Sequence, residues 1–380
     1  MLFSAYNNPS MQDLLKRLIQ TAPTADNGEI RTAEVLQNYL KTAGVETKID
    51  RWDGKNANFI ARIPGTGQKK ALLLAGHLDV VGAEQKAWTT PAFEGIEQNG
   101  KMYGRGATDM LGGLTAITAA IAEIKQNLPL KGDLIFAATA AEETDSAGVK
   151  RFLRTNGPSL DSLVGIIVPE PTGLEVMRMH RGILWLEITT LGKTAHGSMP
   201  HLGINAIEKM TAFLNLFKTY HIPHQPHPLL GGCCVSVNKI TGGQATNIVP
   251  DRCSVQIDIR TLPGQAHNSI VQDVERLLEQ LRRQDKYFNA DITVLRSVPA
   301  METEEDNSFL KAVCKAVSVE KTGAVGFSTD GPWFAKLDAP VVVFGPGDPQ
   351  MCHKPDEYIE IEQLEKAKDA YKRIILEILG

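Results

Sequence analysis

Short, continuous apolar runs alternate with amphipathic helical patterns through the first part of the chain, up to about residue 181. Such runs are typical of strands buried on both faces, because a half-buried strand would alternate apolar and polar residues. Strands separated by helices predict an α/β domain with a mostly parallel sheet covered on both faces. We expect these strands at 71–81, 133–140 and 163–170, and a further one at 339–347.

Helical periodicity fills the intervals between these runs. Residues 10–43 predict one or two amphipathic helices, interrupted near the segment TAPTADNGE. A C-terminal helix is expected in the segment EQLEKAKDAYKRIILEIL. The pattern at 109–126 predicts a helix with one apolar stripe, made of Met110, Leu114, Ile117, Ile121 and Ile124.

Beyond this part the strands alternate apolar and polar residues, as strands buried on one face do. The expected order is strand, helix, strand, strand, helix and strand, at 183–190, 203–219, 233–241, 251–261, 268–284 and 291–297. This is the split β-α-β-β-α-β order of a ferredoxin-like domain. A chain of 380 residues is also too long for one ordinary core. We therefore predict a catalytic domain at 1–181 and 292–380, with a ferredoxin-like domain inserted at 182–291.

Composition excludes several classes of function. The net charge is −4 and no basic block stands out, which argues against nucleic acid as a partner. Five cysteines without a CxxC motif indicate a reducing compartment. The N-terminal segment lacks the pattern of a signal peptide, and no apolar run approaches the length that spans a bilayer. We expect a cytoplasmic protein with no membrane partner.

Candidate metal ligands follow the strands expected in the larger domain. Ligands in open α/β sheets bind at the carboxyl ends of the strands. Taken singly, a histidine there is more often a core residue, an aspartate a helix cap and a glutamate part of a turn. Together at one edge, they favour a metal site. The five candidates are His77, Asp109, Glu143, Glu170 and His353.

A charge count favours two metal ions. Two divalent ions carry four positive charges, which Asp109, Glu143, Glu170 and one hydroxide balance, while the two histidines remain neutral. In this arrangement Asp109 bridges the ions, and each ion takes one histidine and one glutamate as well. Nitrogen and oxygen ligands without thiolate suit Zn, with Co or Mn as alternatives.

Glu142, next to a metal ligand in the segment FAATAAEETD, is the candidate general base. Neighbouring residues on an extended chain point apart, so Glu143 can hold a metal while Glu142 faces the reacting water. Glu142 would take the proton of that water and give it to the leaving amine. Asp79 lies two residues after His77 on the same side of the strand, where it would accept the other ring N–H of His77.

Five segments resemble a known family: GHLDVV, GRGATDMLGG, AAEET, VPEPTG and CHKPDEY, in this order. They resemble the dinuclear-zinc amidohydrolases and exopeptidases that include acetylornithine deacetylase, succinyl-diaminopimelate desuccinylase, aminoacylase and bacterial dipeptidases. The resemblance covers almost the whole chain and implies the same metal ligands. It also implies that the inserted domain is a lid through which a homodimer forms.

The same resemblance implies roles for three residues of the lid. His196, in GKTAHGSMP, would donate to the developing oxyanion, often across the dimer. Asn247 and Arg260 would bind a carboxylate of the substrate, for which the fork of an arginine is suited; a salt bridge within the lid is the alternative for Arg260. The histidines of HIPHQPH, His221, His224 and His227, we interpret as a surface loop of the lid rather than another metal site.

These expectations converge on a two-metal hydrolase that cleaves the amide bond of an N-acyl amino acid. The closing segment is most similar to acetylornithine deacetylases, which would place the protein in amino-acid biosynthesis. A metal-dependent dipeptidase or carboxypeptidase is the alternative within the same chemistry. A non-catalytic, metal-bound binding protein is the alternative from another class, against which the intact Glu142 argues.

Overall fold

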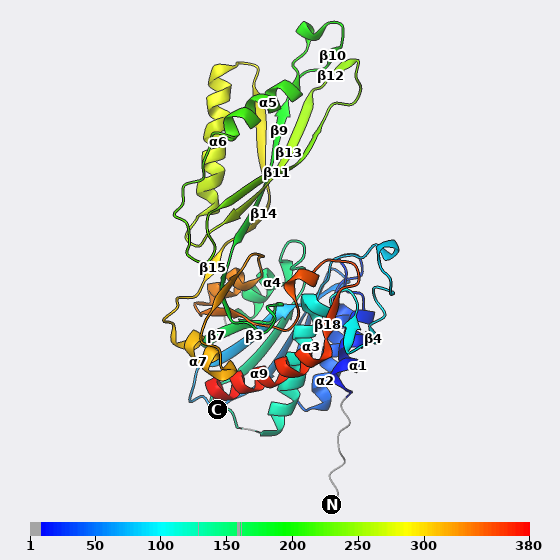
Figure 1. Cartoon of the computed structure of the whole chain (residues 1–380), viewed down its shortest axis with the longest axis vertical. Coiled ribbons are helices and arrows are strands. Elements are labelled where there is room, and N and C mark those ends of the chain that lie inside the picture. Colours follow the sequence, from blue (N-terminus) through cyan, green and yellow to red (C-terminus); the bar gives the residue numbers. More distant parts are fainter. Residues whose placement is uncertain (1–8, 128, 158–159, 161) are drawn as a thin grey trace, which may run out of the picture. The chain divides into compact units, whose positions relative to one another are not determined.

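Figure 1 shows the computed structural model of the chain, which describes residues 9–127, 129–157, 160 and 162–380. The chain divides into two compact units. The first extends to Met179 and resumes over Glu302–Val325 and Thr329–Gly380, and the second comprises His180–Met301 and Gly326–Ser328. The second unit thus continues past the boundary expected at 291 and includes the last strand of its sheet. Residues 1–8, part of the segment where no signal peptide is expected, lie outside the described residues.

The first unit contains a nine-stranded sheet with a parallel centre. Its order is β1-β2-β6-β3-β7-β17-β8-β15, with β16 beside β8. The parallel strands are β3 (Ala71–His77), β6 (Leu134–Thr139), β7 (Leu163–Val168) and β17 (Val341–Val343). The flanking strands are β1 (Glu46–Trp52), β2 (Asn56–Ile63), β8 (Met177–His180), β15 (Met301–Glu302) and β16 (Gly323–Val325). The mostly parallel sheet is confirmed, although the pattern did not predict β1 and β2, which pair antiparallel to each other.

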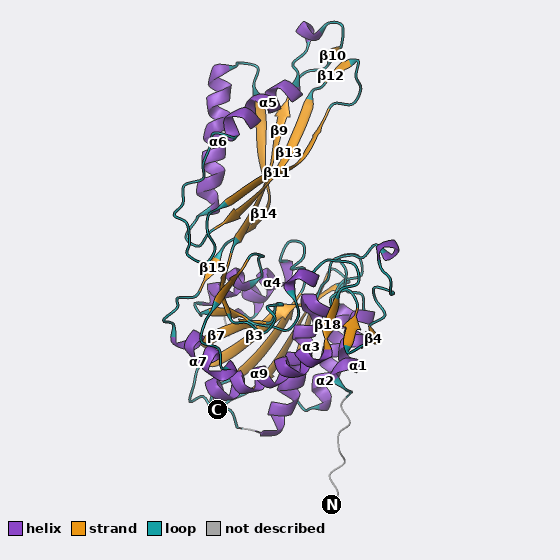
Figure 2. Ribbon diagram, viewed as in Figure 1, coloured by secondary structure: helices purple, strands orange, loops and turns teal. Residues whose placement is uncertain are grey.

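Helices pack against this sheet in two groups (Figure 2). The helical region expected at 10–43 is interrupted as predicted, into α1 (Met11–Gln20) and α2 (Ile30–Thr42). The helices that follow along the chain in this unit are α3 (Gly112–Ile124), α4 (Ala147–Thr155), α7 (Ser308–Val317), α8 (Gly331–Phe334) and α9 (Ile361–Leu379). In one group, α3 and α9 contact each other and β3. In the other group, α4 contacts α8, β2 and β6.

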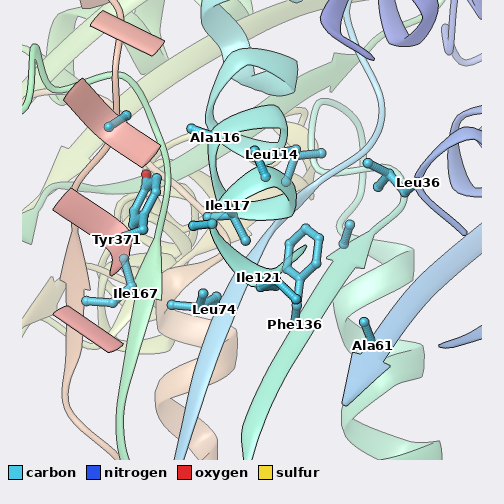
Figure 3. Packing of buried hydrophobic residues seen from close by; sticks show 14 of the residues in the cluster. Leu36, Ala61, Leu74, Leu114, Ala116, Ile117, Ile121, Phe136, Ile167 and Tyr371 are labelled. Carbon is cyan, nitrogen blue, oxygen red and sulfur yellow. The ribbon is translucent and has the colours of Figure 1, made fainter. Parts of the chain in front are cut away.

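The apolar stripe expected on α3 is buried in the core of this unit. Figure 3 shows Ile117 and Ile121 of α3 beside Leu74 of β3 and Phe136 of β6. The segment Ala107–Ile124 is also long and apolar enough to cross a membrane by length and composition, which the sequence pattern did not anticipate. Because 89% of that segment is buried inside the unit, it has the character of a core helix.

The second unit has the predicted ferredoxin-like order. Its sheet runs β11-β13-β9-β14, and all neighbours are antiparallel. The elements are β9 (Gly182–Leu191), α5 (Ala206–Phe217), β11 (Cys234–Gly242), β13 (Arg252–Thr261), α6 (His267–Gln284) and β14 (Asn289–Val298). Alternate apolar residues of β9 and β13 pack with α5 and α6 in one core cluster. Strand β11 lies at the edge of the sheet and is exposed along its whole length.

Two small sheets complete the fold. In the first unit, β18 (Tyr358–Glu360), β5 (Lys101–Tyr103) and β4 (Ile96–Gln98) form a three-stranded sheet. In the second unit, β10 (Ala195–His196) and β12 (Ile248–Val249) pair in a two-stranded sheet at one end of the lid (Figure 1).

Candidate functional site

The five expected metal ligands meet at the carboxyl edge of the parallel strands. His77 is the last residue of β3, Glu143 follows β6 and Glu170 follows β7. His353 lies in the loop after β17, and Asp109 lies in the irregular turn η2 (Ala107–Leu111) that leads into α3. Within the described residues, these side chains form two groups able to hold a metal ion, His77–Asp109–Glu170 and Asp109–Glu143–His353.

Asp109 belongs to both groups and lies between the two histidines. One of its carboxylate oxygens is 3.2 Å from Nε2 of His77, and the other is 3.2 Å from Nε2 of His353. The same nitrogen of His77 is 3.7 Å from Oε1 of Glu170, and that of His353 is 2.9 Å from Oε1 of Glu143. A single carboxylate therefore connects two histidine–glutamate pairs, the arrangement that a bridged two-metal site requires.

Electrostatics explains why this donor set fits cations. Hydrogen bonds to Asp109 and Glu143 raise the pKa of His353 to about 10. Burial lowers the pKa of His77, but Asp109 and Glu170 outweigh this and hold it well above its usual range. The clustered carboxylates thus favour positive charge at this site. In the metal-free form the protonated histidines supply that charge, and bound divalent ions would replace their protons. Imidazole and carboxylate donors suit Zn, Co or Mn.

Glu142 is buried beside this cluster, with an exposed fraction of 6%. Burial raises the pKa of its carboxyl group well above the usual range, and the charge of Asp330 adds to the effect. Asp330 is itself 2% exposed and precedes α8. No local pattern in the sequence singled out this aspartate.

Asp79 differs from the expectation in its hydrogen bonds. Nδ1 of His77 lies 2.9 Å from the main-chain carbonyl oxygen of Asp79, while the nearer carboxylate oxygen is 3.7 Å away. The carboxylate instead accepts the backbone N–H groups of Glu142 and Glu143, both at 3.0 Å. Because β3 ends at His77, the alternation of a strand no longer fixes where Asp79 points. Asp79 and Glu143 also line a cavity of about 520 Å³.

Two buried residues behind the site were not anticipated as functional, Arg105 and Glu357. They form an ion pair with 2.6 Å between Nη1 and Oε2. Both lie in segments that contain expected metal ligands, GRGATD and HKPDEY. The presence of a second charged residue in each segment could have indicated them.

His196 and Asn247 lie together at one end of the second unit. His196 pairs with Ile248 across β10 and β12, and the N–H of Gly197 donates to the carbonyl of Asn247 at 2.7 Å. Nδ1 of His196 contacts the hydroxyl of Ser198 at 2.7 Å. The imidazole is exposed to solvent.

Arg260 lies at the opposite end of the same unit. It sits opposite Cys234 and Ile183, near the end of β13, whereas β13 begins at Arg252 beside the His196 end. Eight residues at about 3.3 Å each separate Arg252 from Arg260 by about 26 Å. Asp258 accepts from Nε of Arg260 at 2.9 Å and from Nη2 at 3.0 Å. The three expected lid residues therefore form two separate groups within one chain.

The histidine-rich loop makes backbone contacts. Nδ1 of His221 lies 3.1 Å from the carbonyl of Thr219, and Nε2 of His224 accepts the N–H of Cys233 at 3.2 Å. Nδ1 of His227 accepts the N–H of Leu229 at 3.2 Å. None of the three histidines belongs to a metal-compatible group in the part of the chain that the structure describes.

Comparison with known proteins adds independent findings. Residues 73–377 match the model of peptidase family M20/M25/M40. A probable succinyl-diaminopimelate desuccinylase of Staphylococcus aureus (strain MSSA476) is 32% identical, over 94% of each chain. The acetylornithine deacetylase of Buchnera aphidicola is 29% identical over 97% of each. Among solved structures, the M20 family metallo-carboxypeptidase Sso-CP2 of Sulfolobus solfataricus has a TM-score of 0.81 at 19% identity, covering 97% of this chain and 99% of that one.

Proposed function

Because the chain belongs to peptidase family M20/M25/M40, we propose that it is a two-metal hydrolase that cleaves the amide bond of an N-acyl amino acid. The observation that carries the proposal is Asp109 between two histidine–glutamate pairs, with Glu142 buried beside them. Relatives named as a desuccinylase and a deacetylase support an acyl group of the acetyl or succinyl kind.

The residues divide the chemistry among them. His77, Asp109 and Glu170 would hold one divalent ion and Asp109, Glu143 and His353 the other. When bound, these ions would polarise the scissile carbonyl and lower the pKa of the attacking water.

Glu142 acts as the proton carrier in this scheme. Its carboxylate takes a proton from the attacking water and delivers it to the nitrogen of the breaking amide bond, so that an amine and a carboxylate leave. A buried carboxyl group with a raised pKa suits this task, because a general base works best when its pKa approaches the working pH.

The lid residues support a homodimer. His196 would donate to the oxyanion, while Arg260 and Asn247 would hold a free carboxylate of the substrate. A separation of about 26 Å along the strand exceeds the length of a small N-acyl amino acid. If His196 and Arg260 contact one substrate, they must therefore come from two chains.

The edge strand β11 offers a surface for this association. Its nine residues are all exposed. Three of them are large apolar residues, Val235, Val237 and Ile240, with exposed fractions of 44%, 43% and 59%. An exposed apolar edge strand is a template for pairing with a second chain. We place the dimer contact at β11 and the protein in the cytoplasm, which suits five free thiols.

A substrate panel tests the proposed function. Metal-stripped protein is reconstituted with Zn, Co or Mn and assayed on N-acetylornithine, N-succinyl-diaminopimelate and a set of dipeptides. We expect hydrolysis of at least one N-acyl amino acid, loss of that activity on stripping and its return with metal. Cleavage of dipeptides alone would identify a dipeptidase instead. Two bound ions without turnover of any substrate would support the non-catalytic alternative.

A further inference from the structure

We propose that Arg105 and Glu357 are positioning residues, which hold the metal ligands Asp109 and His353 in place before any metal binds. The inference rests on the proposed metal centre. It concerns two side chains outside the ligand set, and it predicts which ion each of them affects.

Glu357 fixes the turn that carries Asp109. Its side chain is fully buried, and its Oε1 accepts the backbone N–H groups of Thr108 at 2.9 Å and of Asp109 at 3.0 Å. The hydroxyl of Thr108 also donates to the carbonyl of Tyr358 at 2.6 Å. The peptide groups on the N-terminal side of the shared ligand are thus bonded to one segment of the chain, around residue 357.

Arg105 connects this carboxylate to the loop that carries His353. Its Nη1 donates to Oε2 of Glu357 at 2.6 Å, and its Nη2 donates to the carbonyl of His353 at 3.3 Å. The guanidinium is 4% exposed and lies over the ring of Trp88, 5.2 Å from its centre. The two bonds leave from separate nitrogens of one planar group, a geometry that the single nitrogen of a lysine does not reproduce.

These two ligands need such support because regular structure does not fix them. Asp109 lies in a turn with non-helical backbone angles, φ −116° and ψ 94°. His353 has a φ of +63°, and its side chain is 51% exposed. His77, in contrast, ends a buried strand and is 2% exposed. The Arg105–Glu357 pair therefore acts on the ion that Asp109, Glu143 and His353 would hold, and through Asp109 on the other ion as well.

Metal binding to stripped protein tests this, by calorimetry with Zn and by the visible absorption of Co. Arg105→Lys keeps the positive charge and loses the bond to His353. We expect the ion that Asp109, Glu143 and His353 would hold to lose affinity about 10–100-fold, with a smaller change for the other ion. Glu357→Gln breaks the ion pair and turns an amide NH2 towards either Arg105 or the N–H groups of Thr108 and Asp109, so the affinities for both ions should fall.

Arg178→Lys is the matched control. Arg178 is also buried in the first unit, and its Nη1 donates to Glu302 at 2.7 Å and to the carbonyl of Thr303 at 3.2 Å. It should lower thermal stability and leave both metal affinities unchanged. Unchanged affinities in Arg105→Lys, or equal losses in Arg178→Lys, would overturn the inference. Should Arg105→Lys not fold, Glu357→Gln decides by the same comparison.

A measurement on the unmodified protein completes the test. In stripped wild-type protein, the amide hydrogens of Thr108 and Asp109 should exchange slowly with solvent, because Glu357 already binds them. Fast exchange that becomes slow only with metal would show that the ions order the turn, and the inference would fail. Wild-type protein that binds no pair of ions would refute the metal centre itself, which is a distinct result.

Discussion

In the first unit the candidate functional residues contact one another at one edge of a sheet, whereas in the second unit they are divided between two ends of a sheet. Asp109 contacts both His77 and His353 within 3.2 Å. His196, in contrast, lies on β10 beside the start of the ten-residue strand β13, whereas Arg260 lies near the end of β13. The first unit thus brings its candidate residues together within a single chain, and the second unit keeps its candidates apart.

The direction of the strands explains this difference. Parallel strands all end at the same edge of a sheet, so the loops after β3, β6, β7 and β17 meet there. Successive strands of an antiparallel sheet end at alternate edges, so the loops of the lid separate. A parallel sheet can therefore bring candidate ligands of one chain together, while an antiparallel sheet separates the residues at its two ends.

The largest effect should come from Glu142→Gln. Loss of the general base should reduce kcat by about 10²–10⁴-fold while both ions remain bound. Glu143→Gln should instead weaken one ion, because Glu143 lies 2.9 Å from His353. Metal analysis together with turnover numbers distinguishes the two roles. Loss of metal from Glu142→Gln and retention of both ions by Glu143→Gln would reverse the assignment.

A subunit-mixing experiment tests the division of the lid. Glu142→Ala and His196→Ala, each nearly inactive alone, are dissociated and reassociated together. About half of the dimers are then mixed, and each mixed dimer holds one complete site, so roughly a quarter of full activity should return. If His196 acts within its own chain, every site lacks one group, and activity stays at the level of the separate variants even when subunit exchange is verified.

Arg260→Lys tests the other end of the lid. Lysine keeps the charge but loses the two-pronged geometry, so KM should rise roughly tenfold for substrates with a free α-carboxylate. The corresponding amides should show little change. Arg252→Lys, at the start of the same strand, is the control and should leave KM unchanged. Equal effects of Arg260→Lys on acids and amides would remove Arg260 from carboxylate binding.

The last prediction concerns the folding stability of the chain and rests on His180, the last residue of β8. This side chain is fully buried, and burial lowers its pKa to about 4, against 6.5 for an ordinary histidine. As the pH falls, His180 takes up its proton in the unfolded chain before it does so in the folded chain. The stability that the neutral His180 contributes is therefore complete above pH 6.5 and is lost as the pH falls towards 4. At pH 5 the wild-type protein should be about 2 kcal/mol less stable than at pH 7 through this group alone.

Urea unfolding at pH 5 and pH 7 measures this loss. His180→Gln should remove most of the group's pH dependence, whereas a variant of the exposed His201, His201→Gln, should retain it. An identical pH dependence in wild type and His180→Gln would contradict the prediction.

The sequence by itself determined the parallel centre of the first unit, the ferredoxin-like order of the second and the five candidate ligands. Burial on both faces leaves a continuous apolar run, and burial on one face leaves alternation, so both are readable locally. The sequence pattern did not predict strands β1 and β2. In β1 no residue is fully buried, and the apolar periodicity of this strand is correspondingly weak.

Only the tertiary structure decided how the ligands are supported and how the lid residues are distributed. Arg105 and Glu357 are 252 positions apart, and the carboxylate of Asp79 binds amides more than 60 positions away. The separation of His196 from Arg260 follows from strand pairing. A local pattern indicates whether a residue is buried. A hydrogen bond between residues far apart in the sequence depends on how the whole chain folds, and a local pattern does not contain that information.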